Sequence, residues 1–344
     1  MAPEVPAARA PVSLHEKLEF LSHPAAYPES PACVELRETH LSYVFLTPTS
    51  AYKMKKPVAH EYADLRTLEG RHANCRAEVQ LNRRLAPEVY LGLVALTQGD
   101  NFELVLGGGG TVVEWLVSMQ RLPAELMLDD RLRRGLLQRS DVVALARRLG
   151  AFYSEQPAVE LRIDRYLALL RRQLDVSRQL LASPEFALPP GTLAGIFRTL
   201  GRYLDDGREL AARVLAGRIV EGHGDLRPEH VCLSTPPVII DCLEFSRDLR
   251  LLDPFDEIAF LGLECARMHA PWVGPLLRRS MQTILNDRPG PRPYAFYTGL
   301  RACVRARLAL AHLQEAVVRT PDEWLPRARD YLERAVQACK VIES

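Results

Sequence analysis

The order of apolar segments along the chain limits its fold more than any other feature of the sequence. Up to residue 119 the apolar runs are short, and they predict three strands, one amphipathic helix and three further strands. The predicted strands cover 33–39, 41–47, 51–55, 93–97, 102–106 and 111–119, and the predicted helix covers 62–85. Beyond Pro123, apolar residues recur at helical spacing over long segments. A sheet followed by a run of helices predicts an α+β chain with two lobes.

The same pattern divides the chain into four parts. The N-terminal part is rich in Ala and Pro and is expected to be a flexible tail, and Ser13 with Glu16 predicts the cap of a first helix directly after it. The pattern changes near Pro123, where we expect a hinge between the two lobes. The expected parts are the tail at 1–12, the N-terminal lobe at 13–118, the hinge at 119–123 and the helical C-terminal lobe at 124–344.

Composition and charge exclude several classes of protein. The chain has 344 residues, 47% of them hydrophobic and 25% charged, as in a soluble globular protein. Its formal net charge of +1 provides no overall field that would draw it to nucleic acid or to a membrane, so neither partner is expected. No apolar run approaches the ~20 residues of a membrane-spanning helix. The seven cysteines are scattered and the first residues lack the pattern of a secretory signal, so we expect a cytoplasmic location.

Two aspartates in the C-terminal lobe point to a chemical activity. The segment His223-Gly224-Asp225 precedes a short predicted strand, and Asp241 directly follows the next strand. A hairpin of this kind can direct both carboxylates into one cleft. Transfer of a phosphoryl group from ATP needs such a pair, because one carboxylate accepts the proton of the attacking hydroxyl and the other holds Mg²⁺ against the phosphates.

Together with Ile239-Ile240-Asp241 and Asp253-Pro254-Phe255-Asp256, the His223-Gly224-Asp225 segment resembles the aminoglycoside phosphotransferase family, the small-molecule branch of the protein-kinase-like fold. The resemblance implies a bilobal fold with an antiparallel sheet in the N-terminal lobe and a mainly helical C-terminal lobe. It also implies an ATP-dependent phosphotransferase that moves the γ-phosphoryl group to a hydroxyl of a small molecule, such as an aminoglycoside, an amino sugar or a related metabolite. The implied cofactors are ATP and Mg²⁺.

The resemblance implies roles for three residues of the C-terminal lobe. Asp225 would be the catalytic base and Asp241 the ligand of Mg²⁺. The catalytic loop of the family ends in Asn, whereas this chain has His230 at that position. Mg²⁺ prefers oxygen ligands, and imidazole suits softer metals. As a residue of the metal site, His230 therefore predicts indirect binding of a single ion, a preference for Mn²⁺, or reduced activity.

In the N-terminal lobe, the resemblance implies a lysine that reaches the phosphates of the nucleotide. Lys53 fits this position best, because Ala51-Tyr52-Lys53 has the apolar, apolar, Lys order of the family, and Lys55 points to the same side of the strand. The expected ion-pair partner on the following helix is Glu78, with Glu69 as the second choice.

Two further segments are implied in nucleotide binding. Thr39 and Ser42 lie in the turn expected to cover the phosphates, although this turn contains no glycine. Val117 and Met119 lie where a hinge would bind adenine through backbone groups. The glycine run at 107–110 precedes a strand rather than a helix, so it predicts a β turn and not a phosphate-binding loop.

Some residues of the motifs are expected to be structural. His223 is expected to brace the loop by hydrogen bonds from a buried position. Asp253 and Asp256 are expected to fix their turn and to cap the following helix rather than to touch a substrate.

Two other functions are compatible with the same residues. A nucleotide-binding pseudokinase without turnover is suggested by His230. A metal-dependent hydrolase would instead hold one transition metal, since His and Asp are ligands of such metals. Its four candidate ligands are His223, Asp225, His230 and Asp241.

The sequence leaves the charge of the acceptor open. Three arginines of one predicted helix would favour an anionic acceptor if they point inward, and otherwise they form a solvated face. Three glutamates of other segments would favour a cationic acceptor. The arginines are Arg301, Arg305 and Arg307, and the glutamates are Glu244, Glu257 and Glu264.

Overall fold

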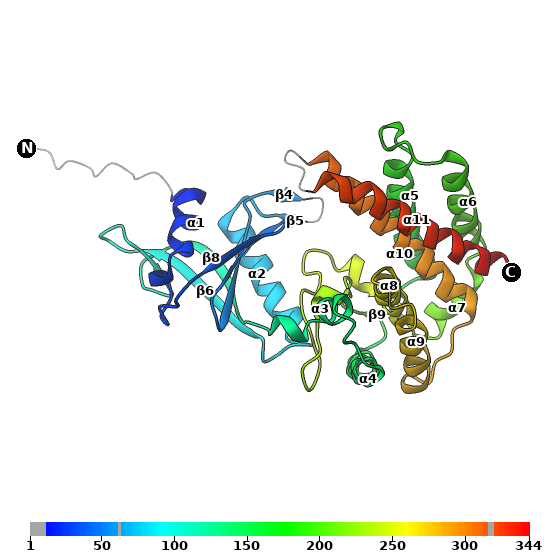
Figure 1. The fold of residues 1–344 in the computed structure, drawn as a ribbon, viewed down its shortest axis with the longest axis horizontal. Helices are drawn as coiled ribbons and strands as arrows, with labels where there is room; N and C mark the ends of the chain where they lie inside the picture. Colours follow the sequence, from blue (N-terminus) through cyan, green and yellow to red (C-terminus); the bar gives the residue numbers. More distant parts are fainter. Residues whose placement is uncertain (1–11, 61–62, 316–319) are drawn as a thin grey trace, which may run out of the picture. The chain divides into compact units, whose positions relative to one another are not determined.

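The computed structural model describes residues 12–60, 63–315 and 320–344. The chain divides into two compact units, Met1–Leu122 and Pro123–Ser344, and the boundary falls within the segment 119–123. The first unit contains the large sheet and the second unit contains most of the helices (Figure 1). Residues 1–11 of the predicted tail lie outside the described residues.

The first unit is built on an antiparallel sheet of six strands in the order β1-β2-β3-β8-β6-β7. Each strand corresponds to one of the short apolar runs, so the predicted antiparallel lobe is confirmed. The strands are β1 Glu35–Glu38, β2 Ser42–Leu46, β3 Ser50–Lys55, β6 Tyr90–Gln98, β7 Leu104–Leu106 and β8 Thr111–Gln120.

Two helices accompany the sheet, and polar side chains fix where both begin. The Ser13 hydroxyl accepts a hydrogen bond from the Glu16 N–H, and the Glu16 carboxylate accepts one from the Ser13 N–H at 2.7 Å, which is the predicted capping box. The second helix begins later than predicted, because Thr67 caps it and a small hairpin precedes it. These elements are α1 Leu14–Ser22, the 3₁₀ turn η1 Pro24–Ala26, β4 Ala59–His60, β5 Ala63–Asp64 and α2 Leu68–Asn82.

Alternation along β3 separates an apolar face of the sheet from a charged one. Tyr52 and Met54 pack into an apolar core with Leu21, a residue of α1. Lys53 and Lys55 point to the opposite face, where α2 packs against the sheet. β3 therefore places the ammonium groups of Lys53 and Lys55 on the face of the sheet that α2 covers.

Besides its helices, the described part of the second unit contains two small antiparallel pairs of strands. Its helices are α3 Leu128–Arg133, α4 Arg139–Glu155, α5 Ile163–Leu181, α6 Pro190–Asp206, α7 Arg208–Leu215, α8 Pro254–Arg267, α9 Val273–Ile284, α10 Pro291–Ala311 and α11 Pro321–Glu343. Its 3₁₀ helices are η2 Ala124–Leu126, η3 Pro184–Phe186, η4 Pro228–His230, η5 Asp248–Arg250 and η6 His312–Gln314. Its strands are β9 Val220–Glu221, which pairs with β12 Leu251–Leu252, and β10 Val231–Cys232, which pairs with β11 Val238–Ile239.

Apolar residues at helical spacing predict one helix over 192–215. Gly207 has a φ of 59°, which ends α6 in a left-handed cap before α7 begins. The β10–β11 hairpin, by contrast, has the predicted position and the antiparallel register.

Buried ion pairs hold the helical unit together. Asp253 caps α8 by accepting a hydrogen bond from the Phe255 N–H at 2.9 Å, and its carboxylate also pairs with Arg213. Asp256 pairs with Arg301 through two hydrogen bonds of 2.7 Å. Both aspartates are therefore structural, as predicted, although Asp256 acts through an ion pair rather than a cap. Removing one partner from such a buried pair costs about 3–5 kcal/mol of stability.

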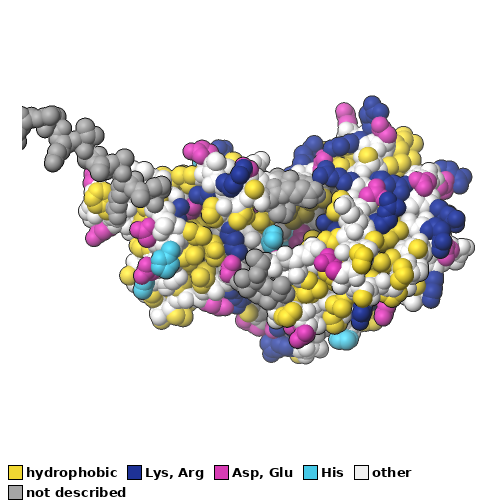
Figure 2. All heavy atoms as spheres, turned by 90° about the horizontal axis from the view of Figure 1, so that it is seen from above, with side chains coloured by type: hydrophobic (Ala, Val, Ile, Leu, Met, Phe, Trp, Pro, Cys, Tyr) yellow, Lys and Arg dark blue, Asp and Glu magenta, His cyan; other side chains and the backbone are white. Residues whose placement is uncertain are grey.

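The surface carries charges of both signs. Figure 2 shows Lys and Arg side chains interspersed with Asp and Glu side chains over the visible face, in keeping with the net charge of +1. Among the described residues, no helix combines the length and the apolar character needed to cross a membrane.

Candidate active site

The loop that carries Asp225 is held in place by hydrogen bonds to a carboxylate of α8. Glu257 accepts hydrogen bonds from the backbone N–H of His223, at 3.0 Å, and of Gly224. The Tyr153 hydroxyl donates a third hydrogen bond to Glu257 at 2.6 Å. Gly224 has a φ of 90°, a conformation that only glycine adopts without strain. The loop is therefore fixed by a buried anchor and by the glycine of the His223-Gly224-Asp225 segment.

His223 joins this loop to the segment that carries Asp241. Its Nε2 lies 2.8 Å from the carbonyl oxygen of Ile240, and its Nδ1 accepts a hydrogen bond from the Asp225 N–H at 3.2 Å. These partners assign the proton to Nε2 and leave the ring neutral. Burial is the main cause that lowers the pKa of His223. The prediction that His223 braces the loop is confirmed.

The Asp225 carboxylate lies at the edge of this loop and is 23% exposed. Its Oδ2 accepts a hydrogen bond from Nε of Arg227 at 3.0 Å. Burial raises the pKa of Asp225, but the surrounding positive charges, Arg227 first and Arg305 among the others, outweigh it and hold the pKa below its usual value. Asp225 is therefore an ionised carboxylate at neutral pH, which a proton acceptor requires.

His230 lies between the two aspartates. Its Nδ1 is 3.6 Å from Oδ2 of Asp225, and its Nε2 is 3.4 Å from Oδ2 of Asp241. The structure thus brings Asp225 and Asp241 together around one imidazole, as the hairpin argument predicted. Asp241 has a φ of 63° and its carboxylate is 41% exposed, so it is the more accessible of the two acids.

Both ring nitrogens of His230 have hydrogen-bond partners within the loop. Nδ1 lies 2.8 Å from the backbone carbonyl oxygen of Asp225 and donates to it, because Nε2 accepts a hydrogen bond from Arg227 at 3.1 Å. The lone pair that a metal would need is therefore directed at a guanidinium group. This geometry argues against a direct metal bond from His230 and assigns it to the support of the loop.

Arg227 is a site residue that the sequence reasoning missed. Its guanidinium group contacts Asp225, His230 and, at 2.9 Å, Glu229. A signal was available, because an arginine two residues after the candidate base and two before another acid can fold back on both.

The donor set around Asp241 suits a hard cation better than a transition metal. Within the described ranges, no three His, Cys, Asp or Glu side chains are placed to hold one metal ion together. The ring nitrogens of His223 and His230 are engaged in hydrogen bonds, which removes two of the four ligands that the hydrolase hypothesis needs. Mg²⁺ commonly uses one or two carboxylates together with phosphate oxygens and water, and the exposed carboxylate of Asp241 fits this pattern.

In the first unit, the two lysines of β3 share one buried carboxylate. Nζ of Lys53 lies 2.8 Å from Oε1 of Glu78, and Nζ of Lys55 lies 2.6 Å from Oε2. The predicted ion pair with Glu78 therefore forms, whereas Glu69 is exposed in the first turn of α2. The Lys53 side chain is 13% exposed and that of Lys55 only 2%, so Lys53 is the more accessible ammonium group.

The two remaining predicted segments have different outcomes. Thr39 and Ser42 close a tight turn between β1 and β2, in which the Thr39 N–H donates to the Ser42 carbonyl oxygen at 2.8 Å and the Thr39 hydroxyl accepts from the Ser42 N–H at 3.0 Å. Val117 and Met119 lie inside β8 and are paired with β3 and β6, so their backbone groups belong to the sheet. Sheet-like hydrogen bonding continues to the Arg121 N–H. An adenine-binding segment would therefore begin after the predicted residues, because both of them lie within a strand that is paired on both sides.

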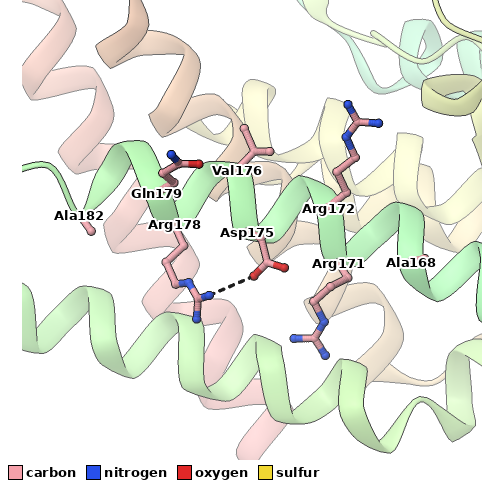
Figure 3. A pocket seen from close by; sticks show the side chains of 8 residues that line it. All are labelled: Ala168, Arg171, Arg172, Asp175, Val176, Arg178, Gln179 and Ala182. Carbon is pink, nitrogen blue, oxygen red and sulfur yellow. Dashed lines mark ion pairs between the residues drawn. The ribbon is translucent and has the colours of Figure 1, made fainter.

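A hollow on the outer side of α5 is separate from these residues. It has a volume of about 870 Å³ and is lined by several arginines, of which Arg178 pairs with Asp175 at 3.4 Å (Figure 3). Arg171 pairs with Asp205 at 2.5 Å. Neither Asp225 nor Asp241 lines this hollow, so it is not the candidate active site.

The six-stranded antiparallel unit, the helical unit and the Asp225–Asp241 hairpin define a protein-kinase-like fold of the kind found in small-molecule kinases. Solved structures with this fold include a choline kinase from Cryptosporidium parvum Iowa II, 12% identical over 94% of this chain and 94% of that one, with a TM-score of 0.54. A thermostable mutant of the aminoglycoside phosphotransferase APH(4)-Ia is 11% identical over 94% and 98%, with a TM-score of 0.53. A choline/ethanolamine kinase family protein from Mesorhizobium loti is 12% identical over 95% and 99%, with a TM-score of 0.52.

Comparison of sequences gives relatives without an assigned function. No family model matches the chain. An uncharacterized protein of Mycobacterium bovis is 30% identical over 294 residues, which is 80% of this chain and 54% of that protein. An uncharacterized protein of Mycobacterium tuberculosis gives the same values. The chain spans about half the length of the curated relatives it matches.

Proposed function

We propose that the chain is a kinase that transfers the γ-phosphoryl group of ATP to a hydroxyl group of a small molecule. The observation that carries this proposal is the convergence of Asp225 and Asp241 on His230, on a loop fixed by Glu257. The shared fold with choline kinase and aminoglycoside phosphotransferase structures supports it. An ionised base and a separate, more exposed carboxylate are the two acidic groups that this chemistry requires.

In this reaction the acceptor oxygen attacks the γ-phosphorus in line with the leaving group. A bond forms between that oxygen and phosphorus, and the bond between phosphorus and the β–γ bridging oxygen breaks, which releases ADP. The hydroxyl proton passes to Asp225, whose lowered pKa keeps it ionised and ready to orient the hydroxyl. When bound, Mg²⁺ would neutralise charge on the phosphates, and Asp241 would hold it.

The first unit contributes the remaining parts of the proposal. Lys53 would contact the phosphates of the nucleotide, because it is more accessible than Lys55 and is held in place by Glu78. Thr39 and Ser42 would form the turn over the phosphates, and the segment after Arg121 would bind the adenine.

Release of ADP tests this function directly. The chain is incubated with Mg²⁺ and ATP and with a panel of hydroxylated small molecules of different charge, and the Asp225→Asn variant is run beside it. Binding of Mg·ATP is followed separately by thermal shift. ADP release that depends on an acceptor and on Asp225 supports the kinase. Binding of ATP with no transfer and no hydrolysis would instead indicate the pseudokinase, and absence of ATP binding would contradict both.

A further inference from the structure

Arg305 is a charged residue of the helical unit with unused hydrogen-bonding capacity. On α10, its Nε donates to Oε1 of Glu264 at 2.9 Å and lies 3.4 Å from the Tyr331 hydroxyl. Within the described part of the chain, its two terminal amino groups make no hydrogen bond, and its side chain is 15% exposed. A planar guanidinium group of this kind binds a carboxylate or a phosphate through two parallel hydrogen bonds.

Arg305 belongs to the same side of the helical unit as the catalytic loop. Glu257, which holds the loop, and Glu264, which holds Arg305, are seven residues apart on α8 and therefore lie on the same face of that helix. α8 also packs against η4, the short helix that ends in His230. The positive charge of Arg305 is among those that lower the pKa of Asp225. These three observations place the guanidinium group close to the proposed base.

Two of the three glutamates that would favour a cationic acceptor, Glu257 and Glu264, are already occupied. Glu264 is 3% exposed and accepts hydrogen bonds from Arg305 and from the Tyr331 hydroxyl, the latter at 2.7 Å. Arg267 lies 3.4 Å from the same carboxylate. Glu257 is fully buried beneath the loop. Two guanidinium groups, those of Arg305 and Arg267, thus share the one carboxylate of Glu264.

A hollow beside Arg267 is also lined by basic side chains. It has a volume of about 610 Å³ and lies between the end of α8 and the segment after α3. Both α3 and α8 pack against η4. The charged or titratable residues that line it are Arg133, Arg267 and His269, together with apolar side chains such as Trp272.

We infer that the acceptor, whose hydroxyl proton Asp225 takes up, carries an anionic group that Arg305 binds. This group is a carboxylate or a phosphate. This inference rests on the proposed kinase function and narrows its substrate class. It sets the chain apart from the choline kinase and aminoglycoside phosphotransferase structures that share its fold, since choline and aminoglycosides are cations. Arg301 is not part of the inference, because it is committed to Asp256.

Binding of small anions isolates the role of Arg305 from the unknown remainder of the acceptor. The nucleotide site of the full chain is first filled with Mg²⁺ and a non-hydrolysable ATP analogue, so that added anions cannot occupy it. Inorganic phosphate and acetate are then titrated separately and followed by calorimetry, which distinguishes phosphate from carboxylate recognition. We expect at least one of them to bind, and Arg305→Gln to weaken it by about tenfold, the value of one charge-assisted hydrogen-bonded contact.

Three further variants keep the test decisive if Arg305→Gln fails to fold. Glu264→Gln removes the carboxylate that competes for Arg305, so anion binding should become tighter, a result that a purely structural role of Arg305 does not give. Arg305→Lys should retain part of the affinity. Arg208→Gln removes an arginine that is 85% exposed and paired with Asp206, and should leave anion binding unchanged.

Measurement of acceptor turnover completes the experiment. The four acceptors share one sugar skeleton and differ in charge. ADP release is compared for glucose, glucosamine, glucuronate and glucose 6-phosphate. Absence of anion binding by the wild type, equal binding by a folded Arg305→Gln, no tightening in Glu264→Gln, or preference for glucosamine would each overturn the inference while the kinase function stands. If the ATP analogue does not bind, the proposed function fails. Titration of the anions without nucleotide still measures the contribution of Arg305 to anion binding.

Discussion

Nε2 of His230 lies 3.4 Å from Oδ2 of Asp241, yet its lone pair accepts a hydrogen bond from Arg227. The ring therefore approaches the proposed Mg²⁺ ligand without being available to the ion. The other ring nitrogen donates to the backbone carbonyl of Asp225, so one imidazole connects the base, the arginine beside it and the second aspartate. His230 therefore supports the geometry of the loop.

Replacement of His230 by Asn tests this assignment through metal preference. Asn has an oxygen that can accept from Arg227, so we expect His230→Asn to retain transfer and to show the same ratio of Mg²⁺- to Mn²⁺-supported rates as the wild type. Asp241→Asn, which removes the proposed ligand, should lose metal-dependent transfer, as should treatment of the wild type with EDTA. Loss of Mn²⁺-supported transfer in His230→Asn, with Mg²⁺-supported transfer unchanged, would show that the imidazole does bind the metal.

Asp225→Asn should abolish turnover and leave nucleotide binding nearly intact. Asparagine keeps the shape of the side chain but cannot accept the hydroxyl proton, and loss of a general base costs about 10²- to 10⁴-fold in rate. The measurements are kcat by ADP release and Kd for Mg·ATP by calorimetry. Unchanged kcat in a correctly folded variant would remove Asp225 from the mechanism.

Arg227→Gln should move the acid limb of the pH profile to higher pH. Arg227 is the principal cation that lowers the pKa of Asp225, and burial of the carboxyl acts in the opposite direction. Without the guanidinium group, burial is less compensated, the pKa of the base rises, and a higher pH is needed to ionise it. The check is the pH dependence of kcat/KM for the acceptor. A profile that does not move, or moves to lower pH, contradicts the ion pair as the cause.

Lys53 and Lys55 should respond differently to replacement by Met. Lys55 is 2% exposed and pairs with a fully buried Glu78, so Lys55→Met should lower the free energy of unfolding by about 3 kcal/mol. Lys53→Met should lower kcat/KM for ATP by about tenfold or more with a smaller loss of stability. Chemical denaturation and steady-state kinetics separate the two effects. The reverse pattern would assign the phosphate contact to Lys55.

Glu257→Gln should weaken the catalytic loop without touching the base. The carboxylate accepts hydrogen bonds from two backbone N–H groups and from Tyr153, and the amide of Gln turns one acceptor into a donor that faces a donor. A buried group left unsatisfied costs about 1–3 kcal/mol. Hydrogen exchange of the loop amides should increase in this variant. Tyr153→Phe, which removes only the third bond, serves as the milder comparison.

Periodicity and local capping predicted most of the fold because they depend on near neighbours in sequence. The strand alternation of Tyr52 and Met54 against Lys53 and Lys55, and the cap of the first helix by Ser13, are both local patterns. The end of β8 was predicted only to within one residue. Its hydrogen bonding continues beyond Met119 through backbone groups, which leave no signature in side-chain hydropathy.

The residues of the candidate catalytic block were also proposed from sequence, but most of their supports were not. The positions of Asp225 and Asp241 follow from the hairpin, and the brace by His223 follows from its place in the motif. The anchor of this loop is Glu257, 34 residues after His223, and the contact depends on how α8 packs. In the same way, the choice of Glu264 as the partner of Arg305 requires the arrangement of two helices.

α8 carries Glu257 and Glu264 on one face, so the residue that shapes the loop and the residue that holds Arg305 move as one rigid body. A displacement along the axis of this helix would change the position of the base and of the anion-binding group together. Under the proposed function, a movement of α8 would therefore change selectivity and rate together. Substitutions of single side chains, such as those of α10 and α11 that contact Glu264, would change the proposed anion-binding group alone.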